Sequence, residues 1–240
     1  MGRHGTIAGR KASQDAKRAQ VFTKYARAIS VAAKAGGDPE YNMSLKHAID
    51  KAKAINMPND NINRAIQKGT GELGGETYET GSFEGYGPGG VAIIVDVLTD
   101  NKNRTTAAVK HAFDKYGGNL GVPGCVSYMF DQKGLILIEK TEKVSEDHLM
   151  EDALEAGAMD MITHEDSYEI QTAPDDFNVV SESLKTLGYE FADADVEYVP
   201  SMEATPGEAD LKLLKKMVDA MEDNDDVQKV YHNCAVEFPE

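Results

Sequence analysis

The sequence contains no tryptophan and only two cysteines, Cys125 and Cys234. Two thiols in apolar, strand-like stretches are typical of a reducing compartment and of buried thiols that form no disulfide. No apolar run reaches the roughly 18 residues that a membrane helix needs. The first residues, MGRHGTIAGRK, lack the apolar core of a secretion signal. We therefore expect a cytoplasmic protein with no membrane partner.

Signatures of catalysis and of metal binding are missing as well. The chain has no GxxxxGK[ST] or GxGxxG phosphate loop and no GxSxG nucleophile motif. Its histidines have no Cys or His partner at ligand spacing, which argues against zinc. The acidic run EDNDDVQ at 222–228 lacks the glycine and the terminal glutamate of a calcium loop. We therefore expect no catalytic residues, no metal, no cofactor and no small-molecule substrate, and hence no enzyme.

Negative charge is abundant, but it is unevenly distributed along the chain. The 240 residues include 41 Asp and Glu against 25 Lys and Arg, a net charge of -16. Residues 1–70 nevertheless hold 13 Lys and Arg against 5 Asp and Glu, a net charge of +8, while the other 170 residues hold 12 against 36, a net of -24. A basic head on an acidic body favours docking on nucleic acid by one end over wrapping around it.

The basic head has the pattern of three short helices. Apolar residues recur at helical spacing from Ser13 to Ala35, before two glycines, and again from Met43 to Ile55. A third helix is predicted to begin after Pro58 and to end at Gly69. We interpret residues 1–79 as a three-helix domain with a basic outer surface. Residues 70–90 are rich in glycine and acid and are predicted to be a linker or an irregular edge.

Strand-like and helical patterns alternate in the rest of the chain. The predicted strands span Val91–Leu98, Cys125–Phe130, Gly134–Glu139, Asp160–His164, Tyr168–Thr172, Phe191–Tyr198, Val227–Tyr231 and Ala235–Phe238. The predicted helices span Thr105–Tyr116, Glu146–Ala156, Asp176–Leu187 and Glu208–Met221.

The order of these elements predicts an α+β fold in which one domain interrupts another. From Gly134 to Val199 the order is β-α-β-β-α-β, a complete ferredoxin-like unit. The flanking β-α-β and α-β-β pieces together make a second unit of the same class. We therefore predict an inserted ferredoxin-like domain at 131–200 and a split α+β domain formed by 80–130 and 201–240.

The stretch LTDNKNRTTAAVKHAF at 98–113 passes from a strand through a polar loop into a helix. Asn103 or Asp100 is suited to be the helix N-cap. Two cations beside the free amides of a helix N-terminus also suit a backbone phosphate. The prediction is a structural cap first, and a second, smaller contact for nucleic acid or a partner protein formed by Asn101, Lys102, Asn103 and Arg104.

The cations of the head are the candidate nucleic-acid-binding residues. For any one of them a solvated helix face is the simpler interpretation, but their concentration in an otherwise acidic chain favours contacts with phosphates. No zinc finger, RNP motif or clear helix-turn-helix indicates a module that reads bases. The set comprises Arg3, Arg10, Lys11, Lys17, Arg18, Lys24, Arg27, Lys34, Lys46, Lys51, Lys53, Arg64 and Lys68.

Several stretches resemble the YebC/PmpR family, namely GRKASQDAKRAQVFTKYARAI, LKHAIDKAKAINMPNDNINRAI, FEGYGPGGVAIIVDVLTDNKNRT and KHAFDKYGGNLG. The resemblance is densest from Lys11 to Phe130. It implies a helical N-terminal domain and two α+β domains, one inserted into the other, with no characteristic activity or cofactor. Members are described as DNA-binding transcriptional regulators or as translation factors that act on ribosomes stalled at consecutive prolines. The mitochondrial member is a translational activator of cytochrome c oxidase.

The N-terminus departs from the family pattern. Many members begin with Gly-His-Ser-Lys-Trp followed by His-Arg-Lys, whereas this chain begins MGRHGTIAGRKASQD. Arg3, His4 and Arg10 keep the basic character, so we still expect binding to a polyanion. Because this chain has no tryptophan, we expect its N-terminus to dock without the stacking contact that an aromatic ring could make.

Three functions fit these observations. The favoured one is a ribosome-associated translation factor that grips ribosomal RNA with its basic head, while its acidic domains face outward or touch basic ribosomal proteins. The alternative is a DNA-binding transcriptional regulator that uses the same head. The acidic body disfavours lying along DNA, although salt screens charges beyond about 10 Å, and no heptad repeat indicates a dimer. The third is a scaffold protein whose head binds an acidic partner protein.

Overall fold

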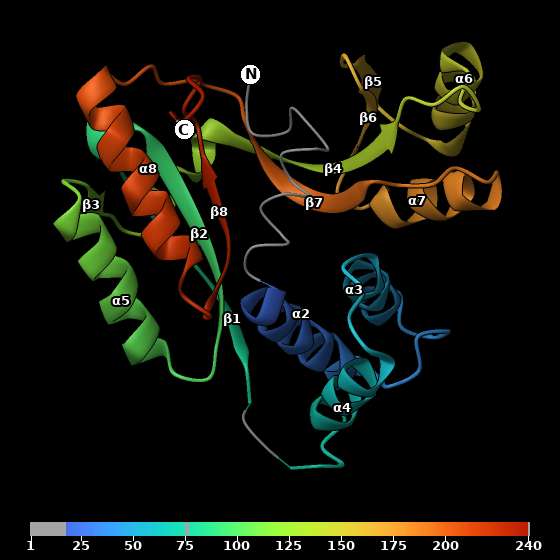
Figure 1. Cartoon of the computed structure of the whole chain (residues 1–240), viewed down its shortest axis with the longest axis horizontal. Helices are drawn as coiled ribbons and strands as arrows, with labels where there is room; N and C mark the ends of the chain where they lie inside the picture. The colour runs from blue at the N-terminus through green and yellow to red at the C-terminus, as the bar shows by residue number, and fades with distance from the viewer. Residues whose placement is uncertain (1–17, 75–76, 240) are drawn as a thin grey trace. The chain divides into compact units, whose positions relative to one another are not determined.

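The computed structural model describes residues 18–74 and 77–239, with side chains from residue 20 onward. It is a mixed α+β fold in which helices come first and two antiparallel sheets follow (Figure 1), which confirms the predicted fold class. The described residues form two compact units, one at 130–201 and the other at 18–129 with 202–239. Within these residues no helix is both long enough and apolar enough to cross a bilayer.

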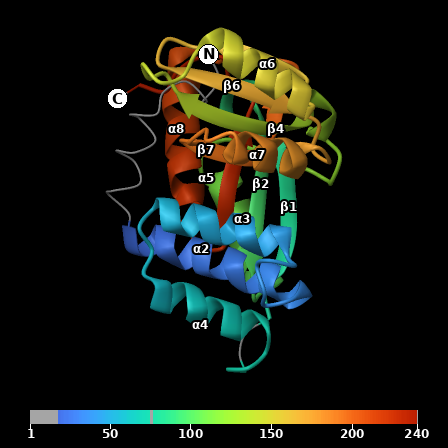
Figure 2. The same cartoon turned by 90° about the vertical axis from the view of Figure 1, so that its right-hand side faces the viewer.

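The head consists of three helices, as predicted. They are α2 (Arg18–Ala32), continued by the 3-10 turn η1 (Ala33–Ala35), α3 (Met43–Ala54) and α4 (Asn59–Gly69). The predicted start of the first helix at residue 13 lies outside the described residues. Helix α2 lies between α3 and α4 (Figure 2), and Ile29, Leu45 and Ile62 join in a buried apolar cluster. The helices therefore form a small bundle with its own core.

The split unit contains a sheet of four strands in the order β3-β1-β2-β8. Its central strand β2 pairs antiparallel on both sides, with Val95 opposite Phe83 of β1 and Val230 of β8. Helices α5 and α8 pack on one face of this sheet, where Phe113 and Leu214 join its core (Figure 1). The elements are β1 (Glu79–Tyr86), β2 (Ala92–Thr99), α5 (Lys102–Lys115), β3 (Asn119–Leu120), α8 (Glu208–Glu222) and β8 (Val227–His232).

Strand β1 corrects the prediction of a linker at 70–90. Its sequence, ETGSFEGY, contains two glycines that ordinarily weaken a strand. One of them is required by packing, because a Cβ on Gly85 would lie 2.7 Å from the ring carbon Cε1 of Phe113. The glycine thus lets α5 approach the strand closely, although glycine-rich composition is more typical of a linker.

Two strands that were predicted are absent from the described structure. Residues 125–130 contain a 3-10 turn, η3 (Ser127–Met129), and a strand begins only at Phe130. The Glu84 carboxylate accepts hydrogen bonds from the backbone amides of Gly124, Val126 and Ser127, which curls this segment around one side chain. Residues 235–238 form no strand either, and an isolated bridge joins Cys234 to Ala204 just before them.

The unit at 130–201 has the predicted order β-α-β-β-α-β. Its antiparallel sheet has the strand order β5-β6-β4-β7, which is the ferredoxin-like arrangement. Ile136 and Ile170 of the sheet pack with Leu149 and Leu184 of the two helices in a separate buried cluster. The elements are β4 (Phe130–Glu139), α6 (Glu146–Ala156), β5 (Asp160–Thr163), β6 (Ser167–Thr172), α7 (Phe177–Thr186) and β7 (Asp193–Pro200).

The contact between α4 and α2 predicts a sensitive position at Gly69. A Cβ there would collide with the Ser30 carbonyl oxygen and lie 2.7 Å from the Ala33 Cβ. We expect Gly69→Ser to lower the free energy of unfolding by about 2 kcal/mol in chemical denaturation, because two backbones must move apart. The control, Gly207→Ser, adds the same atoms where nothing lies within 4 Å, and it should change stability by less than about 0.5 kcal/mol. Equal effects of the two substitutions would contradict this account of the packing.

Candidate nucleic-acid interface

The predicted binding residues do not lie on a single surface. Arg3, Arg10, Lys11 and Lys17 lie outside the described residues, and so does the side chain of Arg18. The remaining cations divide between α2, where they contact the chain itself, and the pair α3 and α4, where several are exposed.

Helix α2 caps the C-terminal end of α8. The Lys24 ammonium donates a hydrogen bond to the carbonyl oxygen of Glu222 at 2.8 Å, and the Gln20 amide donates to that of Asp223 at 2.5 Å. The last carbonyls of a helix have no partner within the helix and carry its partial negative charge. A cation at this position therefore satisfies the helix end both as a donor and as a charge.

Three side chains meet at the carboxylate of Asp226, and we call these four residues together the Asp226 cluster. Arg27 of α2 donates to its Oδ1 at 2.7 Å. Arg104 Nη2 lies 2.8 Å from each of its carboxylate oxygens, and the Thr105 hydroxyl donates to Oδ2 at 2.8 Å. The Asp226 side chain is 4% exposed and that of Arg27 is 14% exposed. One buried carboxylate therefore joins α2, the first turn of α5 and the segment before β8.

The electrostatics of the cluster favour the ionised carboxylate. Burial would raise the pKa of Asp226, but hydrogen bonds from Arg104, Thr105 and Arg27 outweigh it and hold the pKa below the ordinary carboxyl value. Arg27 also donates to the carbonyl of Asp225 at 2.7 Å, while its Nε is buried without a hydrogen-bond partner. The guanidinium is thus already committed to partners within the chain.

The segment before β1 makes a second set of contacts, with Arg27 of α2 and Lys34 of η1. The Arg27 guanidinium lies 5.2 Å from the centre of the Tyr78 ring, which is cation–π distance. The Lys34 ammonium donates to the Tyr78 carbonyl oxygen at 2.6 Å. The predicted binding residues Lys24, Arg27 and Lys34 therefore all make contacts inside the molecule.

The loop at 101–104 is a helix cap, as predicted, but the capping residue is Asn101 and not Asn103 or Asp100. Its side-chain oxygen accepts a hydrogen bond from the Arg104 amide at 3.1 Å, and its extended backbone lets its carbonyl accept from the Thr105 amide. The loop borders an open polar hollow of about 300 Å³.

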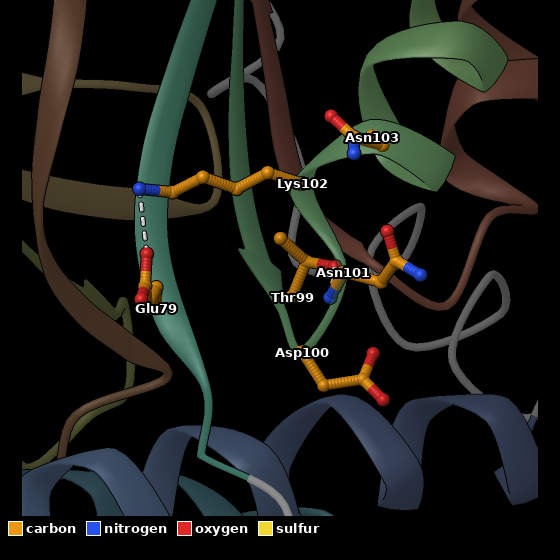
Figure 3. Close-up of a pocket in the computed structure, with 6 residues that line it drawn as sticks. All are labelled: Glu79, Thr99, Asp100, Asn101, Lys102 and Asn103. Carbon is orange, nitrogen blue, oxygen red and sulfur yellow. Dashed lines mark hydrogen bonds and ion pairs between the residues drawn. The ribbon is translucent and has the colours of Figure 1, made fainter.

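The two cations of this loop are paired with acids of the same chain. Lys102 reaches across to Glu79 of β1 at 2.6 Å (Figure 3), and its hydrogen bond lowers the pKa of that carboxyl group. Arg104 pairs with Asp226 and also with Asp100, at 2.6 Å. Arg104 is therefore tied to the buried Asp226, whereas the Lys102 side chain is 69% exposed and pairs with an acid that is itself exposed.

The cations of α3 and α4 behave differently. Lys53, in the last turn of α3, and Arg64 and Lys68, one turn apart on α4, are all exposed. We call these three residues the α3–α4 cations. Lys46 and Lys51 are half-buried and interact within the chain. The α3–α4 cations therefore present their charge to solvent.

Sequence reasoning missed the buried Asp226, which it considered only as part of an acidic run that lacks the features of a calcium loop. The one available signal was that Asp226 directly precedes the apolar strand at 227, whereas its acidic neighbours lie further from it. Within residues 18–74 and 77–239, no group of three or more His, Cys, Asp or Glu side chains is placed to hold a metal ion.

Comparisons with known proteins cover nearly the whole chain. Residues 3–72 match the model of the TACO1/YebC protein N-terminal domain, and residues 78–234 match that of the TACO1/YebC second and third domain. A "Probable transcriptional regulatory protein" of Clostridioides difficile is 61% identical over 239 residues, which is 99% of this chain and 100% of that protein. One of Clostridium novyi with the same description is 52% identical over 235 residues, 98% of this chain and 95% of its own.

A solved structure is also similar. The crystal structure of the conserved hypothetical protein Aq1575 from Aquifex aeolicus matches with a TM-score of 0.83 at 45% identity. The match covers 94% of this chain and 93% of that chain.

The first prediction from the cluster concerns its contribution to stability. We expect Asp226→Ala to lower the free energy of unfolding by about 3 kcal/mol, because it leaves the largely buried Arg27 cation without its carboxylate. The control is Asp219→Ala, which removes an exposed acid of α8 that pairs with Lys215, and it should cost less than about 1 kcal/mol. Calorimetric melting of both variants measures the difference, and equal shifts would remove the special role of Asp226.

The second prediction concerns pH. Because the folded state lowers the pKa of Asp226, its stabilising effect is present above the unfolded carboxyl pKa of about 3.9 and is lost as the pH falls through the lower folded value. The stability gap between the wild type and Asp226→Asn should therefore be constant near neutral pH and shrink below about pH 4. Melting temperatures across this range test the sign, and a gap that widens in acid would refute it.

Proposed function

The chain belongs to the TACO1/YebC family, and from that membership we propose that it is a non-enzymatic regulator of gene expression that binds nucleic acid through its helical domain. In its most specific form, the proposal is a cytoplasmic translation factor that contacts ribosomal RNA and relieves stalled ribosomes. Basic ribosomal proteins would be its further partners.

The observation that carries the proposal is the exposure of the α3–α4 cations. Lys53, Arg64 and Lys68 are open to solvent in the part of the chain that has a net charge of +8. A cation that releases counterions from a nucleic-acid backbone must reach the phosphate. The contacts of Lys24, Arg27 and Lys34 within the chain make the α3–α4 cations the better candidates.

The charge of the remaining chain supports RNA on a ribosome over isolated duplex DNA. Residues 130–201 hold 19 Asp and Glu against 4 Lys and Arg, a net charge of -15. A body so acidic is repelled by a long, uniform polyanion but attracted by basic protein surfaces. A ribosome offers RNA and basic proteins next to each other, and this matches a chain with one basic and one acidic part.

A DNA-binding transcriptional regulator is the second candidate. The Clostridioides difficile and Clostridium novyi relatives are each named "Probable transcriptional regulatory protein", which favours it. The same α3–α4 cations would then contact the phosphates of a duplex. Competition between single-stranded RNA and duplex DNA for the purified protein separates the two candidates. A preference for RNA supports the translation factor, and a preference for duplex DNA supports the transcriptional regulator.

The proposal predicts the effect of reversing the charge of the α3–α4 cations. We expect the triple variant Lys53→Glu, Arg64→Glu and Lys68→Glu to bind a labelled RNA oligonucleotide at least about tenfold more weakly at low salt. Its plot of log affinity against log salt should be shallower by about 2, because each lost phosphate contact on a single strand removes about 0.7 from the slope. Fluorescence anisotropy measures both quantities.

The matched control reverses three exposed lysines on the helices of the split unit, with the variant Lys110→Glu, Lys212→Glu and Lys216→Glu. It makes the same change in net charge and should bind RNA far better than the test variant does. If the two triple variants lose affinity equally, the net charge of the protein and not this surface governs binding. Circular dichroism confirms that both variants are folded.

A further inference from the structure

We propose that residues 222–226, EDNDD, act as a built-in competitor of nucleic acid for the cations of α2, so that the protein binds nucleic acid more tightly once this acidic segment is displaced. This inference rests on the proposed function, and it adds a means of regulating it. The acidic segment connects α8 to β8.

The acidic segment presents to α2 the same chemistry as a phosphate backbone. Its Asp226 carboxylate lies between two guanidinium groups, with Arg27 Nη1 at 2.7 Å and Arg104 Nη2 at 2.8 Å. Paired, planar guanidinium donors are equally suited to carboxylate and to phosphate oxygens. Lys24 and Gln20 complete the set by donating to carbonyl oxygens of the same segment. Side chains of these kinds make most contacts to nucleic-acid backbones.

The contacts named here are polar, which makes the joint between α2 and the acidic segment separable. The apolar cluster of the helical bundle, around Ile29 and Leu45, and that of the split sheet, around Val95 and Leu214, share no residue among the described buried ones. Breaking the joint therefore need not open either core. Interactions between charges also weaken when salt or another polyanion competes for them, whereas apolar packing does not.

The remaining acids of the segment strengthen the competition. Four of its five residues are Asp or Glu, and Asp223 and Asp225 are exposed. Their contacts to Gln20 and Arg27 named above are made by backbone carbonyls. The carboxylate of Asp225 thus adds negative charge beside the α2 cations and repels an approaching phosphate while the segment is in place.

The test compares the binding of a short, labelled single-stranded RNA by the full-length wild type and by Asp226→Asn at low salt. The substitution keeps the size of the side chain and removes the charge shared by Arg27 and Arg104. We expect affinity to rise by roughly tenfold, about the size of one charge-assisted hydrogen bond. The control Asp219→Asn removes one charge from α8, where the acid pairs with Lys215, and its affinity should stay within about twofold of the wild type.

A double-mutant cycle identifies the source of any gain. If Asp226→Asn acts by releasing Arg27, it should raise affinity in the wild-type background but not in the Arg27→Gln background. A gain of equal size in both backgrounds would overturn the inference. So would a folded Asp226→Asn protein that binds RNA no more tightly than the wild type and Asp219→Asn.

A second variant keeps the test decisive if Asp226→Asn does not fold. Asp225→Asn changes an exposed side chain and leaves the carbonyl contact to Arg27 in place. It should bind RNA more tightly than Asp219→Asn does, and a gain no larger than that of Asp219→Asn would count against the inference. Failure of the proposed function has a different result, because the variant with reversed α3–α4 cations would then bind RNA as the wild type does. If none of the proteins, including the wild type, binds RNA, both proposals fall.

Discussion

A carboxylate that is removed from water must be compensated by opposite charges and hydrogen bonds, and in this chain the requirement is met at Asp226 by groups from distant parts of the sequence. Arg27 comes from α2, Arg104 and Thr105 come from the first turn of α5, and Asp226 itself precedes β8. Because Arg27 cannot leave this carboxylate without losing a charged hydrogen bond, the cluster holds α2 against the end of α8. That placement also decides which cations of the head remain available for other partners.

The charge on the head therefore has two uses. On α2 it neutralises the C-terminal end of α8 and the acidic segment, so an excess of cations in the sequence does not translate into an equal excess on the surface. On α3 and α4 it stays exposed at Lys53, Arg64 and Lys68. The first use is structural and the second carries the proposed function. The proposed competition links them, since a polyanion that reached α2 would meet the groups that now hold Asp226.

Much of the fold could be predicted from the sequence because its signals are local. Pro58 and Gly69 bracket α4, and the alternating and helical patterns from 130 to 201 give the ferredoxin-like order. Strand β1 could not be recognised, since its Gly85 is explained only by the close approach of Phe113 and of the Asn119 carbonyl oxygen. The segment at 125–130 resembles a strand in composition, but the side chain of Glu84, forty residues away, curls it into a turn.

The candidate site was predictable only in part, because contacts between residues far apart in the sequence determine it. Helical periodicity shows which cations share a face of α2, but it does not reveal that an acidic loop about 200 residues later in the chain lies opposite them. Nor does the run EDNDD distinguish the buried Asp226 from the exposed Asp223 and Asp225. Local composition identified a basic head correctly, and long-range contacts decided which of its charges are used internally.

The most direct test of the central claim is sedimentation of cell lysate through a sucrose gradient at two salt concentrations, with RNase-treated and DNase-treated controls. The account predicts that the protein migrates with ribosomes at low salt, and that this association is lost at high salt or after RNase treatment but not after DNase treatment. A protein that stays at the top of the gradient under every condition would contradict it.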